Sequence, residues 1–474
     1  MFSRLSSLRK NPGVCAVIIL FAALATSATA WRIYDNYSEP TAGEFDWYNR
    51  GLSDFHAIYF YSKAFADGVN PYSPETQGGE YLFSRSAPAY SPVVFLVRLP
   101  FLWLNLQTAD VACFIYNLGL LGLLAWLGPR MAMAYFSPAA NAQVDRKSAK
   151  KRTVVESLTV FFGLLTLVII SRPGHATLFT GYFTAELALG TIVALHYART
   201  RPVISGFGMV FASGKPTFVL PLIMMMIFRK NFRALVCGLL FCTIAGMTGL
   251  IWLGSHSDGG IADVVQGLQA GQEALHDDPT ERPVNLWSRT DIVGVTAKFV
   301  DAVPGDSVYL AAMPLILLLP AIAVWRIADT ESNSGGTGLS AMIVCVSMLL
   351  AIYHHSYECL VLVTSWIGLA FYGQPKELTG RTRLIVSLLL AVPAANYAST
   401  LMVRIRLGFE QTDFIWMLIT AINTVCLLAA LGILLVVAFR TKPGNPDLNC
   451  ESRIESRPTR KEKVSEKPVD ALSG

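Results

Sequence analysis

The chain has 474 residues, of which 53% are hydrophobic and only 15% are charged, and its mean hydropathy is +0.46. A soluble domain carries about 25% charged residues, so this composition excludes an ordinary soluble protein. The net charge of +5 comes largely from basic loops between apolar runs, which indicates membrane orientation rather than a surface for nucleic acid.

Apolar runs near the ~20 residues that cross a bilayer recur along the whole length, so we expect an all-α polytopic membrane protein. The first run follows a basic start and resembles a secretory signal. Because many further spans follow, we interpret it as an uncleaved first helix. Lys and Arg mark alternate ends of the runs, which predicts that both termini are cytoplasmic. The ten predicted crossings are 14–31, 110–131, 153–171, 177–198, 234–253, 306–326, 339–353, 357–372, 383–403 and 414–439.

Two further apolar stretches are interrupted. Arg98 and Pro100 interrupt residues 91–107, and Gly214-Lys215-Pro216 divides residues 203–228 into two short halves. Broken helices at membrane depth are tolerated only where they line protein or a wet cavity. We expect a re-entrant hairpin or two short tilted helices at 203–228, and ten to twelve spans in all.

The polar segments predict the domain organisation. Two long loops, 31–90 and 254–305, fall on the side opposite the termini, and the second is acidic. The tail, 441–474, is polar and charged, so we expect it to be disordered and cytoplasmic. Residues 1–440 should form one integral-membrane domain of the cell membrane, whose active site faces the outer or periplasmic side. The cysteines lack a metal-binding spacing such as CxxC, and we expect neither a metal nor a cofactor.

The first outer loop carries the most informative residue, Asp54. Within the loop, residues 45–65 (FDWYNRGLSDFHAIYFYSKAF) are typical of an amphipathic helix in the headgroup plane, which ends at the turn 68–72, and Asp54 stands at its start. Asp is a good N-cap, and a catalytic role does not exclude capping. A carboxylate at the water–lipid boundary suits a base that acts on lipid-anchored substrates.

Three other ionisable residues fall in or beside apolar runs. An intramembrane lysine such as Lys215 is rare and functional by default, although it also reaches an interface by snorkelling. His354 and His355 end an apolar run with Glu358 nearby. They are either phosphate ligands or interfacial histidines bonded to a neighbouring helix. Adjacent histidines on a regular helix point apart, so we expect at most one of them to touch a ligand.

Several short motifs follow one another along residues 45–375. They are Asp54, Tyr59, Ala64, Gly68 and Pro71-Tyr72, then Tyr90-Ser91-Pro92, Gly174-His175, Gly206 through Lys215-Pro216, Asn285-Leu286-Trp287-Ser288 and Tyr353-His354-His355. In this order they resemble glycosyltransferase family 87, which includes polyprenyl-phosphate-mannose-dependent mannosyltransferases. His175 stands where the family usually has glutamine, so no role of that glutamine is carried over.

The resemblance implies a GT-C fold and an inverting transferase. Its donor is a polyprenyl-phosphate sugar, by default mannose, and its acceptor is lipid-linked or a glycan. General-base catalysis is worth about 10²–10⁴ in rate, and the phosphate leaving group is already a stable anion, so no metal is required. The candidate residues are Asp54 as base; Lys215, His354 and His355 for the donor phosphate; and His56, Tyr59, His175 and Asn285 for substrate contacts.

Two other functions remain open at the level of sequence. A transporter or flippase of lipid-linked sugars also has broken helices and buried charge, but no internal repeat between the two halves is found. An O-antigen-type ligase or polymerase would place its key Arg and His in the loop 254–305, which contains both. Neutralising the acid or base of each outer loop would discriminate between these functions.

Overall fold

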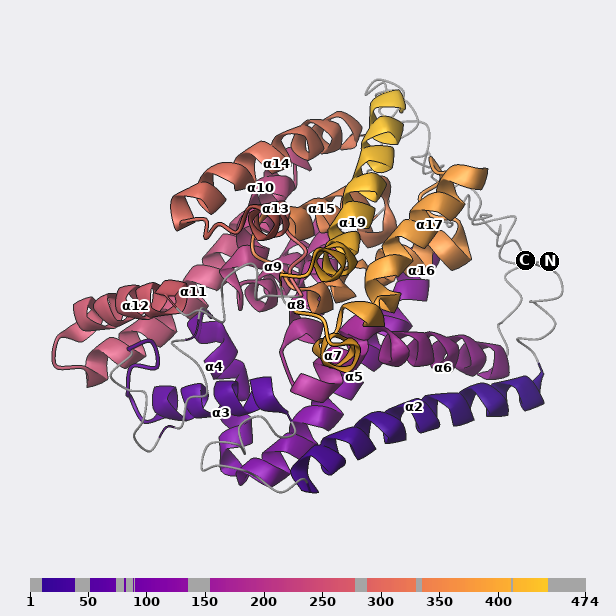
Figure 1. Cartoon of the computed structure of the whole chain (residues 1–474). Helices are drawn as coiled ribbons and strands as arrows, with labels where there is room; N and C mark the ends of the chain where they lie inside the picture. Colours follow the sequence, from indigo (N-terminus) through magenta and orange to yellow (C-terminus); the bar gives the residue numbers. More distant parts are fainter. Residues whose placement is uncertain are drawn as a thin grey trace, which may run out of the picture.

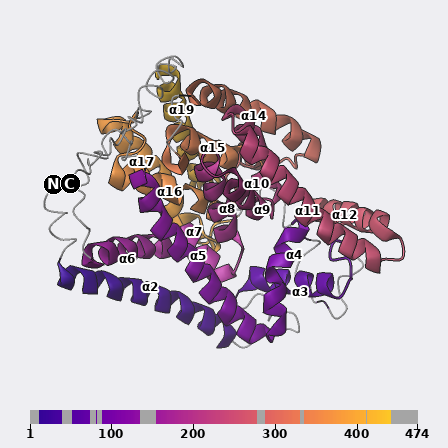
Figure 2. The same ribbon diagram turned by 180° about the vertical axis from the view of Figure 1, so that it is seen from behind.

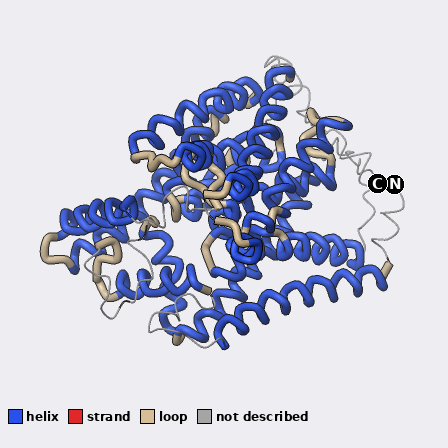
Figure 3. The backbone as a smooth tube through the Cα atoms, viewed as in Figure 1, coloured by secondary structure: helices blue, strands red, loops and turns tan. Residues whose placement is uncertain are grey.

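The computed structural model of the chain describes residues 11–38, 52–73, 81, 88, 90–134, 154–277, 288–329, 335–410 and 412–441. These residues form helices and turns and contain no strand, which confirms the all-α prediction (Figure 3). The predicted tail lies outside the described residues, apart from its first position. Most of 39–51 and 74–89 in the first outer loop also lies outside them.

Among the described residues, six helices are long and apolar enough to cross a membrane, which confirms a multi-pass membrane protein. The pair α6 (Val154–Ile170) and α7 (Arg172–Thr180) is bent by 73° and would make a seventh span. Large apolar side chains such as Leu315 and Val236 are more than 60% exposed, as expected of a surface that meets lipid. The six spans are formed by α2 (Pro12–Ser38), α5 (Leu106–Ala134), α11 (Phe232–His256), α14 (Asp306–Ile327), α17 (Gly380–Ala395), whose span continues to Ser399, and α19 (Phe414–Arg440).

Shorter apolar helices lie at several of the other apolar stretches of the sequence. The stretch 203–228 is divided into two short helices, because Lys215 is extended and Pro216 begins the second of them. Ten to twelve crossings would require these short helices to count as spans, so that number stays a prediction. They are α4 (Pro92–Arg98) with η3 (Leu99–Trp103), α9 (Pro202–Ala212), α10 (Pro216–Phe228), α15 (Leu339–Ala351), and η7 (Ser356–Leu362) with α16 (Val363–Tyr372).

The core lies around α15 and α8 (Thr184–Tyr197), which long helices surround (Figures 1 and 2). Every residue of α15 is buried. A Cβ atom at Gly190 of α8 would lie 2.6 Å from the carbonyl oxygen of Gly208 on α9, so these two backbones pack in direct contact. Such close approach through small residues is typical of helix pairs in membranes.

The short helix α3 (Ser53–Ala66) lies at one end of the molecule, close to α4 and on the same side as α12 (Gly260–Asp277) (Figure 1). It forms where the sequence predicts a helix. Nine of its 14 residues are buried against the rest of the protein. The remaining short elements are α13 (Ile292–Val300), η6 (Gly335–Thr337), η8 (Tyr397–Ser399) and α18 (Leu401–Leu407).

Candidate active site

Asp54 lies in the first turn of α3, where the helix dipole stabilises an acidic side chain. It is not the N-cap, because Leu52 holds that position. The start of α3 is docked on the turn after α7: Gly181 has a φ of +71°, and a Cβ there would lie 2.6 Å from Cβ of Phe55. Glycine at position 181 therefore allows the approach that sets the position of Asp54.

The Asp54 carboxylate is half-buried, and it has no hydrogen bond or ion pair with any described residue. Its charge interacts instead with the phenols of Tyr182 and Tyr357. A partly exposed carboxylate that no described residue holds can accept a proton from a bound hydroxyl group.

An aromatic cluster connects Asp54 to His355. Tyr90 precedes α4, Tyr182 lies between α7 and α8, and Tyr357 belongs to η7. The ring centre of Tyr182 lies 5.9 Å from that of Tyr90 and 5.2 Å from that of Tyr357. The ring of Tyr357 stacks on that of His355, with 4.9 Å between their centres. Segments far apart in the sequence thus form one aromatic cluster, on two of whose phenols the charge of Asp54 acts.

His355 is fixed by two hydroxyl groups. Its Nδ1 lies 2.6 Å from Oγ of Ser288, and its Nε2 lies 2.8 Å from the hydroxyl of Tyr353. An isolated antiparallel β-bridge between Arg289 and His355 brings these segments together. Since one ring nitrogen of a neutral histidine donates and the other accepts, His355 links two hydroxyls in a chain that can relay a proton.

Glu358 connects the residues that the sequence singled out for the phosphate. Its Oε1 pairs with Nζ of Lys215 at 2.5 Å, and its Oε2 accepts from Nδ1 of His354 at 2.6 Å and from the backbone N–H of His355 at 3.0 Å. All of these groups are buried. The charge of Lys215 is therefore compensated within the protein, and the lysine does not snorkel to the surface.

The two adjacent histidines point to different partners, because residues 352–355 lie outside a regular helix. His354 faces Glu358 and the ring of Phe218, whereas His355 faces the aromatic cluster. The two rings point apart, as expected for neighbouring residues, but they do so on an irregular backbone rather than on a regular helix. Sequence reasoning gave Glu358 no role, although the i, i+4 spacing to His354 and the need of a buried lysine for an anion were signals for it.

Arg289 is a further cation that sequence reasoning did not place here. Its guanidinium group lies 4.1 Å from the ring centre of Tyr353, and Nζ of Lys215 lies 5.0 Å from the same centre. Asp291 neutralises Arg289 through two hydrogen bonds of 2.6 and 2.9 Å. Tyr353 is thus in contact with two cations that both have carboxylate partners.

Other predicted substrate residues lie apart from this cluster. His56 is buried and its Nε2 bonds the carboxylate of Asp110 at 2.9 Å, and the hydroxyl of Tyr59 donates to the carbonyl of Leu104. His175 lies on α7 beside α2, where its Nε2 accepts from Arg32. These contacts are those of packing residues.

Asn285 of the predicted Asn-x-Ser element lies outside the described residues, so its predicted role stays a prediction. Ser288, the last residue of that element, is described and reaches His355.

The described residues thus form a multi-pass helical protein in which the charge of the half-buried Asp54 carboxylate acts on Tyr182 and Tyr357 of an aromatic cluster. The sequence model of glycosyltransferase family 87 matches residues 89–352, more than half of the chain. The chain belongs to glycosyltransferase family 87, as its motifs indicated. The matched region includes Lys215 and ends one residue before Tyr353. Comparisons with curated proteins and with solved structures gave no match.

Proposed function

We propose that this glycosyltransferase is an inverting enzyme that uses a polyprenyl-phosphate sugar, with mannose as the default, and that Asp54 is its general base. The acceptor would be a lipid-linked sugar or a glycan at the outer face of the cell membrane. The observation that carries the proposal is the Asp54 carboxylate, which is half-exposed and lacks a partner among the described residues, beside Tyr182 and Tyr357.

In the proposed reaction an acceptor hydroxyl attacks the anomeric carbon from the face opposite the phosphate. The new bond joins the acceptor oxygen to that carbon, the bond from the carbon to the phosphate oxygen breaks, and the proton passes to Asp54. The polyprenyl phosphate leaves with the electron pair as an anion. It needs hydrogen-bond donors or cations rather than a strong acid.

Lys215, His354 and His355 remain the proposed contacts of the donor phosphate. The electrostatic argument for Lys215 changes, because the lysine is paired within the protein. Because Glu358 neutralises Lys215, the lysine would bind through its remaining N–H groups rather than as an isolated charge. His355 is the better placed of the two histidines, since it stacks on Tyr357 of the aromatic cluster.

The decisive experiment incubates membranes that contain the full chain with radiolabelled polyprenyl-phosphate sugars, one at a time, and identifies the lipid product. Transfer from one donor, lost in Asp54→Asn, would support the proposal. Transfer from a nucleotide sugar but from no lipid donor would overturn the donor class while leaving the family intact.

The two alternative functions have less support. Membership of a glycosyltransferase family disfavours a transporter or flippase. For a ligase or polymerase, the described residues of the second outer loop offer little: Asp291 pairs with Arg289, and His256 packs on Trp252. Retained transfer in Asp54→Asn together with loss in Arg289→Gln would favour that function.

A further inference from the structure

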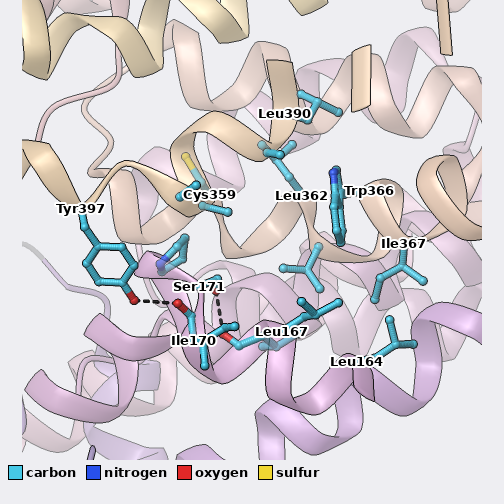
Figure 4. Close-up of a pocket in the computed structure, with 16 residues that line it drawn as sticks. Leu164, Leu167, Ile170, Ser171, Cys359, Leu362, Trp366, Ile367, Leu390 and Tyr397 are labelled. Carbon is cyan, nitrogen blue, oxygen red and sulfur yellow. Dashed lines mark hydrogen bonds between the residues drawn. The ribbon is translucent and has the colours of Figure 1, made fainter. Parts of the chain in front are cut away.

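An apolar cavity of about 400 Å³ lies between α6, α7, η7, α16 and α17 (Figure 4). Its lining is almost entirely hydrocarbon and includes Leu164, Leu167, Leu362, Trp366 and Leu390. The indole N–H of Trp366 donates to the carbonyl of Ser387, so no polar group of this side chain needs a partner in the cavity. A space of this kind accepts a hydrocarbon chain.

The cavity opens on the surface that meets lipid. Leu167, Ile170 and Tyr397 line it and are each between 38% and 49% exposed. Tyr397 stands at its edge, where its hydroxyl donates to the carbonyl of Ile170 at 2.7 Å (Figure 4). Since α6 ends at Ile170 and α17 at Ala395, this edge lies at the ends of both helices.

A cation lies beside that edge. The ring of Tyr397 is 6.3 Å from the ring of His175, and Nε2 of His175 accepts a hydrogen bond from Arg32 at 3.0 Å. The guanidinium of Arg32 also lies 5.2 Å from the ring centre of Phe179. The Nδ1 of His175 faces Oγ1 of Thr29 at 3.4 Å. His175 and Phe179 therefore hold Arg32 in one place.

Arg32 retains most of its binding capacity. A guanidinium group has five N–H donors, and only the bond to His175 joins Arg32 to another described residue. No carboxylate among the described residues forms an ion pair with it. An exposed arginine with open donors binds a phosphate group through two parallel hydrogen bonds.

We propose that this cavity and Arg32 form a binding site for one anionic glycerophospholipid, with an acyl chain in the cavity and the phosphate on Arg32. Basic pockets beside apolar grooves between membrane helices recognise anionic lipid head groups in this way. His175 is a positioning residue of the site, because both of its ring nitrogens already have partners. The inference goes beyond the proposed transfer reaction and does not depend on it.

The site is separate from the reaction centre. Tyr357 and Glu358 of η7 face the aromatic cluster and Lys215, whereas Cys359 and Leu362 of the same turn line the cavity. The charge of Arg32 acts on His175 and Tyr397, and that of Asp54 acts on Tyr182 and Tyr357. We therefore expect a lipid bound at Arg32 to be distinct from the sugar donor.

The test measures lipid retention by the purified full chain. The protein is incubated in detergent with phosphatidylglycerol or phosphatidylcholine, and bound lipid is counted by native mass spectrometry. We expect the unchanged chain to retain one phosphatidylglycerol molecule. Arg32→Gln should bind it at least about tenfold more weakly, because one charge-assisted contact is lost. Ala391→Trp should lose binding, because the larger side chain fills the cavity. Ala394→Phe is a second filling variant in case the first does not fold.

Arg406→Gln is the matched control, since Arg406 is another exposed arginine, on α18, which follows α17 and η8. It should retain the lipid like the unchanged chain. The proposal would be overturned if the unchanged chain retained phosphatidylglycerol and phosphatidylcholine equally or retained neither. It would also be overturned if Arg406→Gln lost as much lipid as Arg32→Gln. Displacement of phosphatidylglycerol by polyprenyl phosphate at equal concentration would assign the cavity to the substrate path and would also overturn the proposal.

Discussion

Asp54 and Lys215 could be singled out from the sequence, because a charge beside or within apolar sequence is costly and needs a reason. Their partners could not. Glu358 lies 143 residues from Lys215, and only the fold brings the two together. Without that partner the sequence could not show that the charge of the lysine is compensated within the protein.

Replacing Asp54 by asparagine should lower the rate of sugar transfer at least about 100-fold, because the amide cannot take the proton of the acceptor hydroxyl. The variant should fold normally, since the carboxylate makes no hydrogen bond with a described residue. Initial rates in membranes at matched protein levels test this. Asp67→Asn, an exposed acid at the other end of α3, is the control and should keep its activity; wild-type turnover in Asp54→Asn would reject the assigned base.

Replacing Lys215 by methionine should destabilise the protein by about 3–5 kcal/mol, because the buried carboxylate of Glu358 would lose its lysine partner. The double variant Lys215→Met, Glu358→Gln should recover much of that loss. Thermal unfolding in detergent compares the three proteins. If the stable double variant uses the donor with unchanged affinity, Lys215 does not contact the phosphate.

At the scale of elements, apolar runs locate most helices within a few residues, as for α11 and α14. Breaks are predicted less well. The run 177–198 reads as one crossing, yet Gly181 divides it between α7 and α8, because the turn there must accommodate α3. Nothing in the sequence of residues 177–198 indicates that a helix from a distant part of the chain contacts them.

Gly181→Ala should lower both stability and activity. The left-handed backbone costs a residue with a Cβ about 1–2 kcal/mol, and the added atom would also press on Phe55 and shift the start of α3. Gly408→Ala is the matched control, since its φ is +70° and nothing lies within 4 Å of the added Cβ. Both variants should lose similar backbone energy, but only Gly181→Ala should also lose transfer rate.

For the whole molecule, composition is sufficient to predict a helical membrane protein, because bilayer thickness and backbone hydrogen bonding leave few alternatives. The position of the proposed reaction centre could not be derived in the same way. The residues proposed for it lie on α3, before α4, in the turn before α8 and in η7, and periodicity carries no information about how such segments meet.

The distribution of Lys and Arg predicts that residues 136–152 and the tail are cytoplasmic, and that 31–90 and 254–305 face the other side. Single cysteines introduced near residues 60 and 145 into a cysteine-free chain would be labelled with an impermeant reagent. Labelling near residue 60 from the cytoplasmic side alone would reverse the orientation, and with it the face on which transfer takes place.

The β-bridge between Arg289 and His355 joins two segments from the second half of the chain, so it can form only late in synthesis. Asp54 belongs to the first part of the chain to be synthesised, and His355 and Glu358 follow in its last third. At translation rates of about 5–20 residues per second, these groups enter the membrane many seconds apart. The proposed reaction centre is therefore incomplete until most of the chain has been inserted.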